Sequence, residues 1–218
     1  MKTYLLAEDN NTSHVRASVL KKFKVVQDSA FDEQLTRTRD ESLWISEKFD
    51  FFQRAFRSTE ESIYKNQIDL RKRVNILLIG DVPLEAQRSL EAIFKEAIVI
   101  AHKSALPIEE LLEVVGGKNS EKYVIGGLVD KTTHTITLIR GDLSKVAVPF
   151  SSFHRGGQGI EPDFSNLTID DSGQTVKLGA YEASVDAIFY EFDPTYRKKR
   201  KRELAKSDKG FGACLRRL

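Results

Sequence analysis

Large apolar side chains in the first half of the chain recur at helical intervals. From residue 40 to 73 no Gly or Pro interrupts the sequence, and the apolar positions recur in steps of three, four and seven, which places them on one helical face. We predict one long helix over 40–73 with an aromatic seam that packs in the core of the same chain or binds a partner helix. The seam comprises Ile45, Phe49, Phe52, Phe56 and Ile63.

Further helices are predicted before and after this segment. Val19 lies in a stretch with helical spacing, and the segment 24–26 that follows suits either a short strand or the end of that helix. Pro83 and Pro107 each suit the first turn of another helix. Residues 1–118 are therefore expected to form a helical region.

The pattern changes near Tyr123 to one of strands. Apolar and polar side chains alternate from Thr133 to Ile139, as in a half-buried strand, and Pro149 suits an edge strand. The run Asp170-Asp171-Ser172-Gly173 predicts the turn of a hairpin. We expect residues 119–192 to form a small, mainly antiparallel β-sheet domain.

A basic helix is predicted after this domain. Asp193 suits its N-cap and Pro194 its first position. Helices, then strands, then a helix are typical of an α+β protein with segregated elements rather than one with alternating strands and helices. Three parts are expected: a helical region 1–118, a β-rich domain 119–192 and a basic C-terminal helix 193–218.

Charge is concentrated in this last helix. The 218-residue chain has a net charge of +2, but residues 193–218 carry ten Lys and Arg against three Asp and Glu, a local charge of +7, so residues 1–192 carry −5. A basic segment on an acidic body indicates a polyanionic partner, because cations that neutralise phosphates release counterions. The alternative is a solvated helix face. The predicted nucleic-acid contacts are Arg197, Lys198, Arg200, Lys201, Arg202, Lys206, Arg216 and Arg217.

The sequence shows no catalytic or metal-binding motif. The four histidines lack metal-ligand spacing, the single cysteine excludes a Cys-rich zinc site, and both a P-loop and a nucleophile elbow are absent. Glu8-Asp9 and Lys103 invite comparison with the acidic pocket of response-regulator receiver domains, but the chain between them does not have the pattern of alternating strands and helices. We expect a non-enzymatic protein without metal or cofactor.

The sequence also lacks the pattern of a membrane or secreted protein. Its apolar runs are far shorter than the roughly 18 residues that span a bilayer. The charges of Glu8 and Asp9 follow the first apolar run too soon for a signal peptide. We therefore expect a cytoplasmic protein without membrane contact.

Residues 123–218 resemble an uncharacterised bacterial β-rich domain family. The similarity lies in Tyr123–Asp130, in Ile136–Asp142 and in Val148-Pro149-Phe150-Ser151-Ser152-Phe153, a segment that follows a hairpin. Such domains often precede a Cro/repressor-type helix-turn-helix, and Asp208–Leu218 resembles the opening of its first helix. The resemblance implies a DNA-linked regulator. Because these residues do not include a recognition helix, only backbone contact is expected.

Two functions are compatible with the sequence. The first is a DNA-associated, transcriptional-regulator-like protein whose basic helix contacts phosphates without reading bases. The alternative is a protein-interaction module, such as an antitoxin-like adaptor, in which the aromatic seam binds a protein partner or a second copy of the chain in a homodimer.

Overall fold

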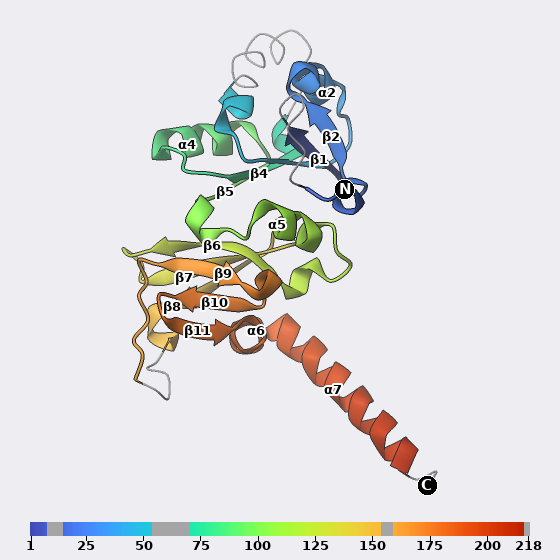
Figure 1. The fold of residues 1–218 in the computed structure, drawn as a ribbon, viewed down its shortest axis with the longest axis vertical. Coiled ribbons are helices and arrows are strands. Elements are labelled where there is room, and N and C mark those ends of the chain that lie inside the picture. Colours follow the sequence, from blue (N-terminus) through green and yellow to red (C-terminus); the bar gives the residue numbers. More distant parts are fainter. Residues whose placement is uncertain (8–14, 54–69, 154–158, 216–218) are drawn as a thin grey trace. The chain divides into compact units, whose positions relative to one another are not determined.

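The protein is described from a computed structural model, in which the chain divides into two compact units, Met1–Lys118 and Asn119–Leu218. Figure 1 shows the elements of both units. The described residues are 1–7, 15–53, 70–153 and 159–215, except for the side chains of 28, 32, 36 and 206–215.

A parallel sheet of five strands forms the frame of the first unit. Its strand order is β2-β1-β3-β4-β5, and every neighbouring pair is parallel. This order, with β1 beside β3, is that of flavodoxin-like doubly wound sheets. The strands are β1 (Lys2–Ala7), β2 (Lys24–Gln27), β3 (Ser42–Ser46), β4 (Val74–Ile79) and β5 (Glu96–Ile100).

Both faces of this sheet are buried. Tyr4 and Trp44 are register partners on one face and their rings stack with centroids 4.3 Å apart. On the opposite face, the next residues along the same strands, Leu5 and Ile45, are also register partners and also buried. Parallel strands covered on both faces carry continuous apolar runs, and all six residues of β4 are buried accordingly.

Helices alternate with these strands along the chain. Residues of α2 and α4 join the core on the Trp44 face, where the Phe31 ring meets Trp44 edge to face, while Figure 1 shows α5 on the other side of the sheet. The helices are α1 (Ala17–Leu20), α2 (Phe31–Arg37), a helical stretch over 49–53, α4 (Leu84–Ile93) and α5 (Ile108–Val115).

The prediction of a helical N-terminal region, and with it the segregated α+β class, is therefore wrong. Residues 42–46 form a strand in the middle of the sheet, although the spacing from Ile45 onward had suggested a helix. The reason is that a short strand buried on both faces shows no alternation, so its apolar residues fall into helical spacing with those of the next element. Strands and helices alternate here. The sequence argument against a receiver-like arrangement, which assumed that they do not alternate, is therefore also wrong.

Two antiparallel sheets of three strands form the second unit, in agreement with the alternation in its sequence. Their strand orders are β6-β7-β8 and β11-β10-β9. β8, which contains Pro149, is an edge strand as predicted. The strands are β6 (Val124–Asp130), β7 (Thr135–Arg140), β8 (Lys145–Pro149), β9 (Leu167–Asp170), β10 (Thr175–Leu178) and β11 (Tyr181–Ser184).

The predicted turn at 170–173 joins β9 to β10. Asp171, Ser172 and Gly173 all have positive φ, and the Asp170 carboxylate accepts a hydrogen bond from the Asp171 amide at 2.8 Å. Asp tolerates this left-handed conformation better than most residues, and Gly adopts it without strain. The local composition therefore explains why the chain reverses here.

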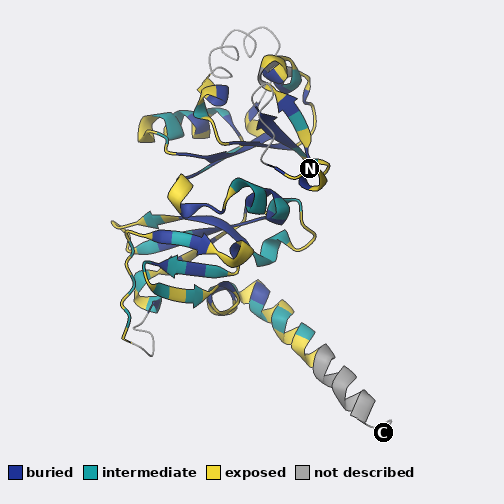
Figure 2. Cartoon of the chain, in the orientation of Figure 1, coloured by how far each residue is buried: buried dark blue, intermediate teal, exposed yellow. Residues whose placement is uncertain are grey.

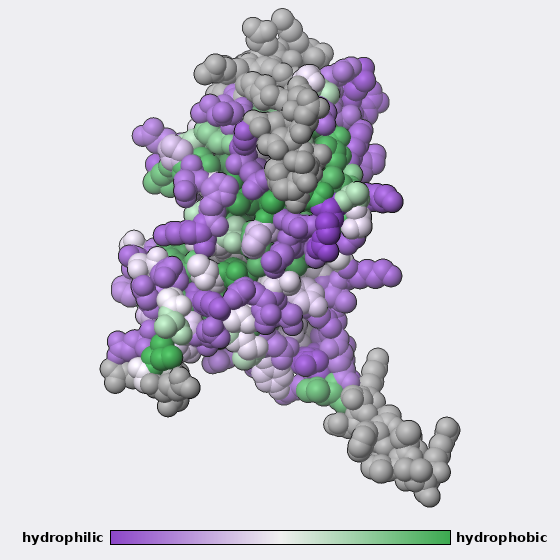
Figure 3. Space-filling model, in the orientation of Figure 1, coloured by the Kyte–Doolittle hydropathy of each residue, from purple (hydrophilic) through white to green (hydrophobic). Residues whose placement is uncertain are grey.

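Two helices follow the second sheet. α6 (Val185–Phe192) packs on β8 and β11, and α7 (Pro194–Leu215) packs on α6. In Figure 2 the buried residues lie mainly along the strands and at the first turns of α7. Hydrophilic side chains predominate on the face drawn in Figure 3. Among the described residues, the large apolar side chains that are exposed lie apart in the sequence: Met1, Leu84, Leu128, Tyr190 and Leu204.

Candidate nucleic-acid interface

The basic helix α7 begins at the residues that the sequence predicted. One oxygen of the Asp193 carboxylate accepts hydrogen bonds from the amides of Thr195 and Tyr196, at 2.8 and 3.0 Å. Pro194 takes the first helical position, where its missing N–H costs no hydrogen bond. The N-cap therefore sets where the basic segment starts.

A buried arginine holds this N-cap against the sheet. Arg140, the last residue of β7, donates a hydrogen bond to the other carboxylate oxygen of Asp193 at 2.7 Å. The side chains are only 9% and 18% exposed. The Arg140 guanidinium also lies 3.9 Å from the ring centre of Phe189 in α6. One ion pair thus ties β7, α6 and α7 together.

The same contacts set the ionisation of Asp193. Burial raises the pKa of its carboxyl, but the hydrogen bonds from the Tyr196 amide, from Arg140 and from the Thr195 amide outweigh burial and hold this pKa below its ordinary value. Asp193 is therefore a carboxylate at neutral pH, as the N-cap and the ion pair both require.

Several side chains on one side of α7 anchor the helix to its unit. Tyr196 is buried, and its hydroxyl donates to the Asp186 carboxylate at 2.5 Å. Burial and this hydrogen bond raise the pKa of Tyr196 well above its usual value. Arg197 donates to the carbonyl oxygens of Tyr190 and Glu191. It thereby satisfies carbonyls in the last turn of α6, which have no partner within that helix.

Two more cations of α7 belong to this side, of which only Arg200 was among the predicted contacts. Lys199 donates to Glu121 at 2.7 Å, which lowers the pKa of that carboxyl, and Arg200 faces Asp186 and Glu203 at 3.5 and 3.7 Å. These pairs are largely exposed, so each stabilises the fold by only about 0–1 kcal/mol. Tyr196, Arg197, Lys199 and Arg200 are called the anchoring residues below.

The remaining described cations form a second group on α7. Lys198, Lys201 and Arg202 are exposed, and among the described residues they have neither an ion pair nor a hydrogen bond. At about 3.6 residues per turn, their spacing from Tyr196 puts them on the side of α7 opposite this buried ring. They are called the cation row below.

The predicted set of eight nucleic-acid contacts is thus divided by the structure. Arg197 and Arg200 are anchoring residues, while Lys198, Lys201 and Arg202 form the cation row. The side chain of Lys206 and the residues Arg216 and Arg217 lie outside the described part of the chain.

The predicted aromatic seam is not a continuous surface. Ile45 lies in β3 and Phe52 in the helical stretch that follows, and both are buried in the first unit. Phe49 packs against the same core. Phe56 and Ile63 lie outside the described residues. The partner-binding interpretation is therefore wrong for Ile45 and Phe52, because no side chain buried inside a unit can form an interface.

Other candidate chemistry is weaker. The residue at the end of β3 is Ser46, not an acid. Its hydroxyl donates to the carbonyl oxygen of Lys48 and accepts from the amide of Lys48, both at 3.0 Å. Glu8 and Asp9 lie outside the described residues. Within the described part of the chain no cluster of His, Cys, Asp and Glu could hold a metal ion. Among the helices described there, none combines the length and apolar character needed to span a membrane.

The residues that position α7 could not be found from the sequence. Arg140 lies 53 positions before Asp193, and Glu121 lies 78 positions before Lys199. No local sequence pattern around Arg140 or Glu121 indicates the residue with which it pairs. Only the cap of α7 had a sequence signal, Asp193 followed by Pro194.

Comparisons with family models, curated proteins and solved structures give no match for this chain. The flavodoxin-like strand order describes the topology of the first unit and carries no functional assignment. The resemblance of residues 123–218 to a bacterial β-rich domain stays a prediction.

Proposed function

We propose that this chain is a non-enzymatic, DNA-associated regulatory protein whose helix α7 binds the phosphate backbone of duplex DNA. The supporting observation is the division of the α7 cations into anchoring residues and a cation row. The resemblance of residues 123–218 to domains that precede a helix-turn-helix points in the same direction.

The cation row has the properties that phosphate binding needs. Lys198, Lys201 and Arg202 are spaced by three and four residues, so they are neighbours on the helix surface. Because no described acidic group neutralises them, they attract anions without first breaking an ion pair. Each phosphate that such a residue neutralises contributes about 0.9 to the slope of log K against log salt concentration.

The anchoring residues make this row a prepared surface. Among them, Tyr196 and Arg197 fix the first turns of α7 to α6, and Arg140 separately ties the N-cap Asp193 to β7, before any ligand binds. A surface that is ordered in advance loses less conformational entropy on binding. The row contains no group that is placed to read bases, so binding is expected to be independent of sequence.

The test compares two variants with equal charge. The full chain, a row variant (K198Q, K201Q and R202Q) and a control variant (K21Q, R88Q and K131Q) are titrated with a random-sequence duplex over a salt series. The control removes three exposed cations elsewhere. We expect the row variant to lose up to about 2.7 from the slope, and the control to lose far less.

Two results would count against the proposal. If both variants bind with the slope of the unmodified chain, phosphate contact does not involve the cation row. If the control weakens binding as much as the row variant, net charge alone explains the affinity. Circular dichroism of each variant checks that the helix content of the chain is unchanged.

A further inference from the structure

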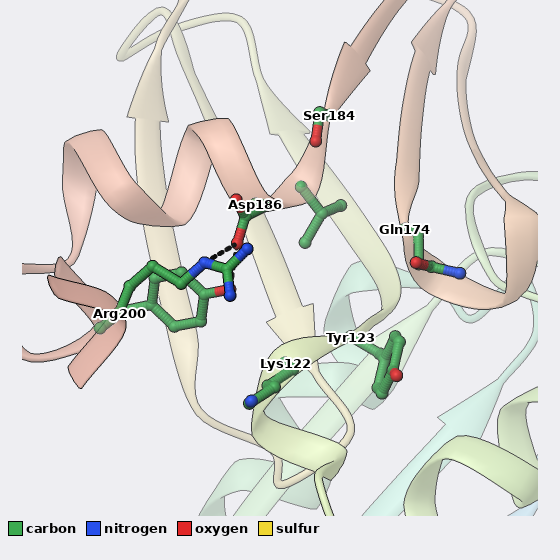
Figure 4. Close-up of a pocket in the computed structure, with 8 residues that line it drawn as sticks. Lys122, Tyr123, Gln174, Ser184, Asp186 and Arg200 are labelled. Carbon is green, nitrogen blue, oxygen red and sulfur yellow. Dashed lines mark hydrogen bonds and ion pairs between the residues drawn. The ribbon is translucent and has the colours of Figure 1, made fainter. Parts of the chain in front are cut away.

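An open cleft lies in the second unit between α7, the start of α6 and the short 3₁₀ helix Ser120–Lys122 (Figure 4). Its volume is about 290 Å³. Polar side chains dominate its lining, which includes Lys122, Tyr123, Gln174, Ser184, Asp186 and Arg200. None of the three residues of the cation row lines this cleft, so it is a candidate ligand site separate from that row.

The two cations of the cleft are incompletely paired. Lys122 donates a long hydrogen bond to Glu203 at 3.4 Å, and Arg200 lies 3.5 and 3.7 Å from Asp186 and Glu203 without a hydrogen bond to either. A charge-assisted hydrogen bond is normally about 2.7–2.9 Å, the distance found between Lys199 and Glu121. Arg200 has two ion pairs but no hydrogen bond to any described residue, so the N–H donors that face neither acid are available to a ligand.

An acid stands directly beside these donors. Asp186, in the first turn of α6, accepts a hydrogen bond from Tyr196, but its side chain is half exposed and its carboxylate has further acceptor sites. Figure 4 shows Arg200 and Asp186 side by side, with Lys122 on the same side of the cleft and Gln174 across from them. The cleft therefore presents positive and negative groups next to each other.

We propose that this cleft binds a free α-amino acid. The carboxylate of the ligand would pair with Arg200 and Lys122, and its ammonium group with Asp186. An α-amino acid carries its two opposite charges on one carbon, so it complements adjacent charges of opposite sign. A simple anion would meet repulsion from Asp186, and a simple amine would meet repulsion from Lys122 and Arg200.

The size and lining of the cleft agree with this class of ligand. A volume of about 290 Å³ lies at the lower end for small-molecule sites, which begin at about 300 Å³. Gln174 and Tyr123 line the side away from Arg200 and can contact the amino-acid side chain (Figure 4). They offer an amide and a phenol, which favour a polar over an aliphatic side chain.

The test is calorimetric titration of the full chain with each of the common amino acids. Acetate and methylammonium at matched ionic strength are the single-charge controls. We expect at least one amino acid to bind saturably with a Kd of about 1 mM or lower, and both controls to bind at least about tenfold more weakly. This proposal is independent of DNA binding.

Variants locate the binding. Asp186→Asn keeps the acceptor for Tyr196 but removes the negative charge, and Lys122→Gln removes one of the two cations. Each should weaken amino-acid binding at least about tenfold, while Lys131→Gln, an exposed cation outside the cleft, should leave it unchanged. Circular dichroism confirms that each variant is folded.

Three outcomes overturn the proposal. No saturable binding by any amino acid up to about 10 mM would exclude it. Binding of acetate as tight as that of the amino acid would make the cleft a simple anion site. Amino-acid binding that survives both Asp186→Asn and Lys122→Gln would place the ligand elsewhere.

Discussion

Arg140 and Asp193 form a buried ion pair. When one of them is removed, the contacts that remain to the other differ. Without Asp193, the Arg140 charge stays buried and, among the described residues, keeps only its contacts with the rings of Phe189 and Tyr196. Without Arg140, the Asp193 carboxylate still accepts two amide hydrogen bonds. The loss of the acid should therefore be the more harmful of the two.

The prediction is an asymmetric pair of variants. Asp193→Ala removes a helix cap, worth about 0.5–2 kcal/mol, and orphans a buried cation, so we expect a loss of about 3–5 kcal/mol in the free energy of unfolding. Arg140→Met should cost less, because Met fills the space beside Phe189 without a charge. Urea unfolding of both variants measures the difference. A larger loss for Arg140→Met would show that the cap matters little.

At the scale of elements, the turn between β9 and β10 depends on one glycine. Gly173 has φ +88°, and a Cβ placed there would lie 2.4 Å from the carbonyl oxygen of Val124. That oxygen belongs to the backbone of β6, which cannot move aside without disturbing its sheet. Gly159 provides a matched comparison, since its φ is +75° but a Cβ would meet nothing within 4 Å.

We predict that the two glycines respond differently to alanine. Gly159→Ala should cost only the strain of a left-handed alanine, roughly 1–2 kcal/mol. Gly173→Ala should cost more than about 3 kcal/mol, because the same strain is joined by a clash with backbone. Thermal or urea unfolding checks both values. Equal losses would mean that the β6 backbone yields easily at Val124.

Elements differ in how far the sequence could predict them, and the reason is physical. The turn at 170–173 and the cap at Asp193 are specified by neighbouring residues, and both were predicted. The strands β1 and β3 are specified by their place inside a parallel sheet, and no neighbouring residue records that place. The aromatic spacing after Ile45 favoured a helix that begins only at residue 49.

The same distinction applies to the candidate interface. The basic run 197–202 is visible in the sequence as a cluster of charge. Its division into anchoring residues and a cation row is not, because Glu121, Asp186 and the α6 carbonyls approach α7 only in the folded chain. A charge cluster therefore predicts the helix that binds, whereas the fold decides which of its cations are available.

At the scale of the whole molecule, each unit has a core of its own. The first core surrounds Trp44 between the parallel sheet and the helices α2 and α4. The second includes Ile136, Val176 and Phe189, all of them fully buried. Units with separate cores are expected to unfold in separate steps when no large apolar interface joins them.

The chain allows this to be tested directly, because its one tryptophan, Trp44, lies in the first unit and reports on that unit alone. We predict two transitions in urea by circular dichroism, of which only one appears in Trp44 fluorescence. Phe52→Ala, which truncates a ring packed edge to face on Phe94, should cost about 3–5 kcal/mol and shift the fluorescence transition. Arg140→Met, in the second unit, should shift only the transition that is absent from Trp44 fluorescence. If either variant moves both transitions together, the two units form one cooperative structure.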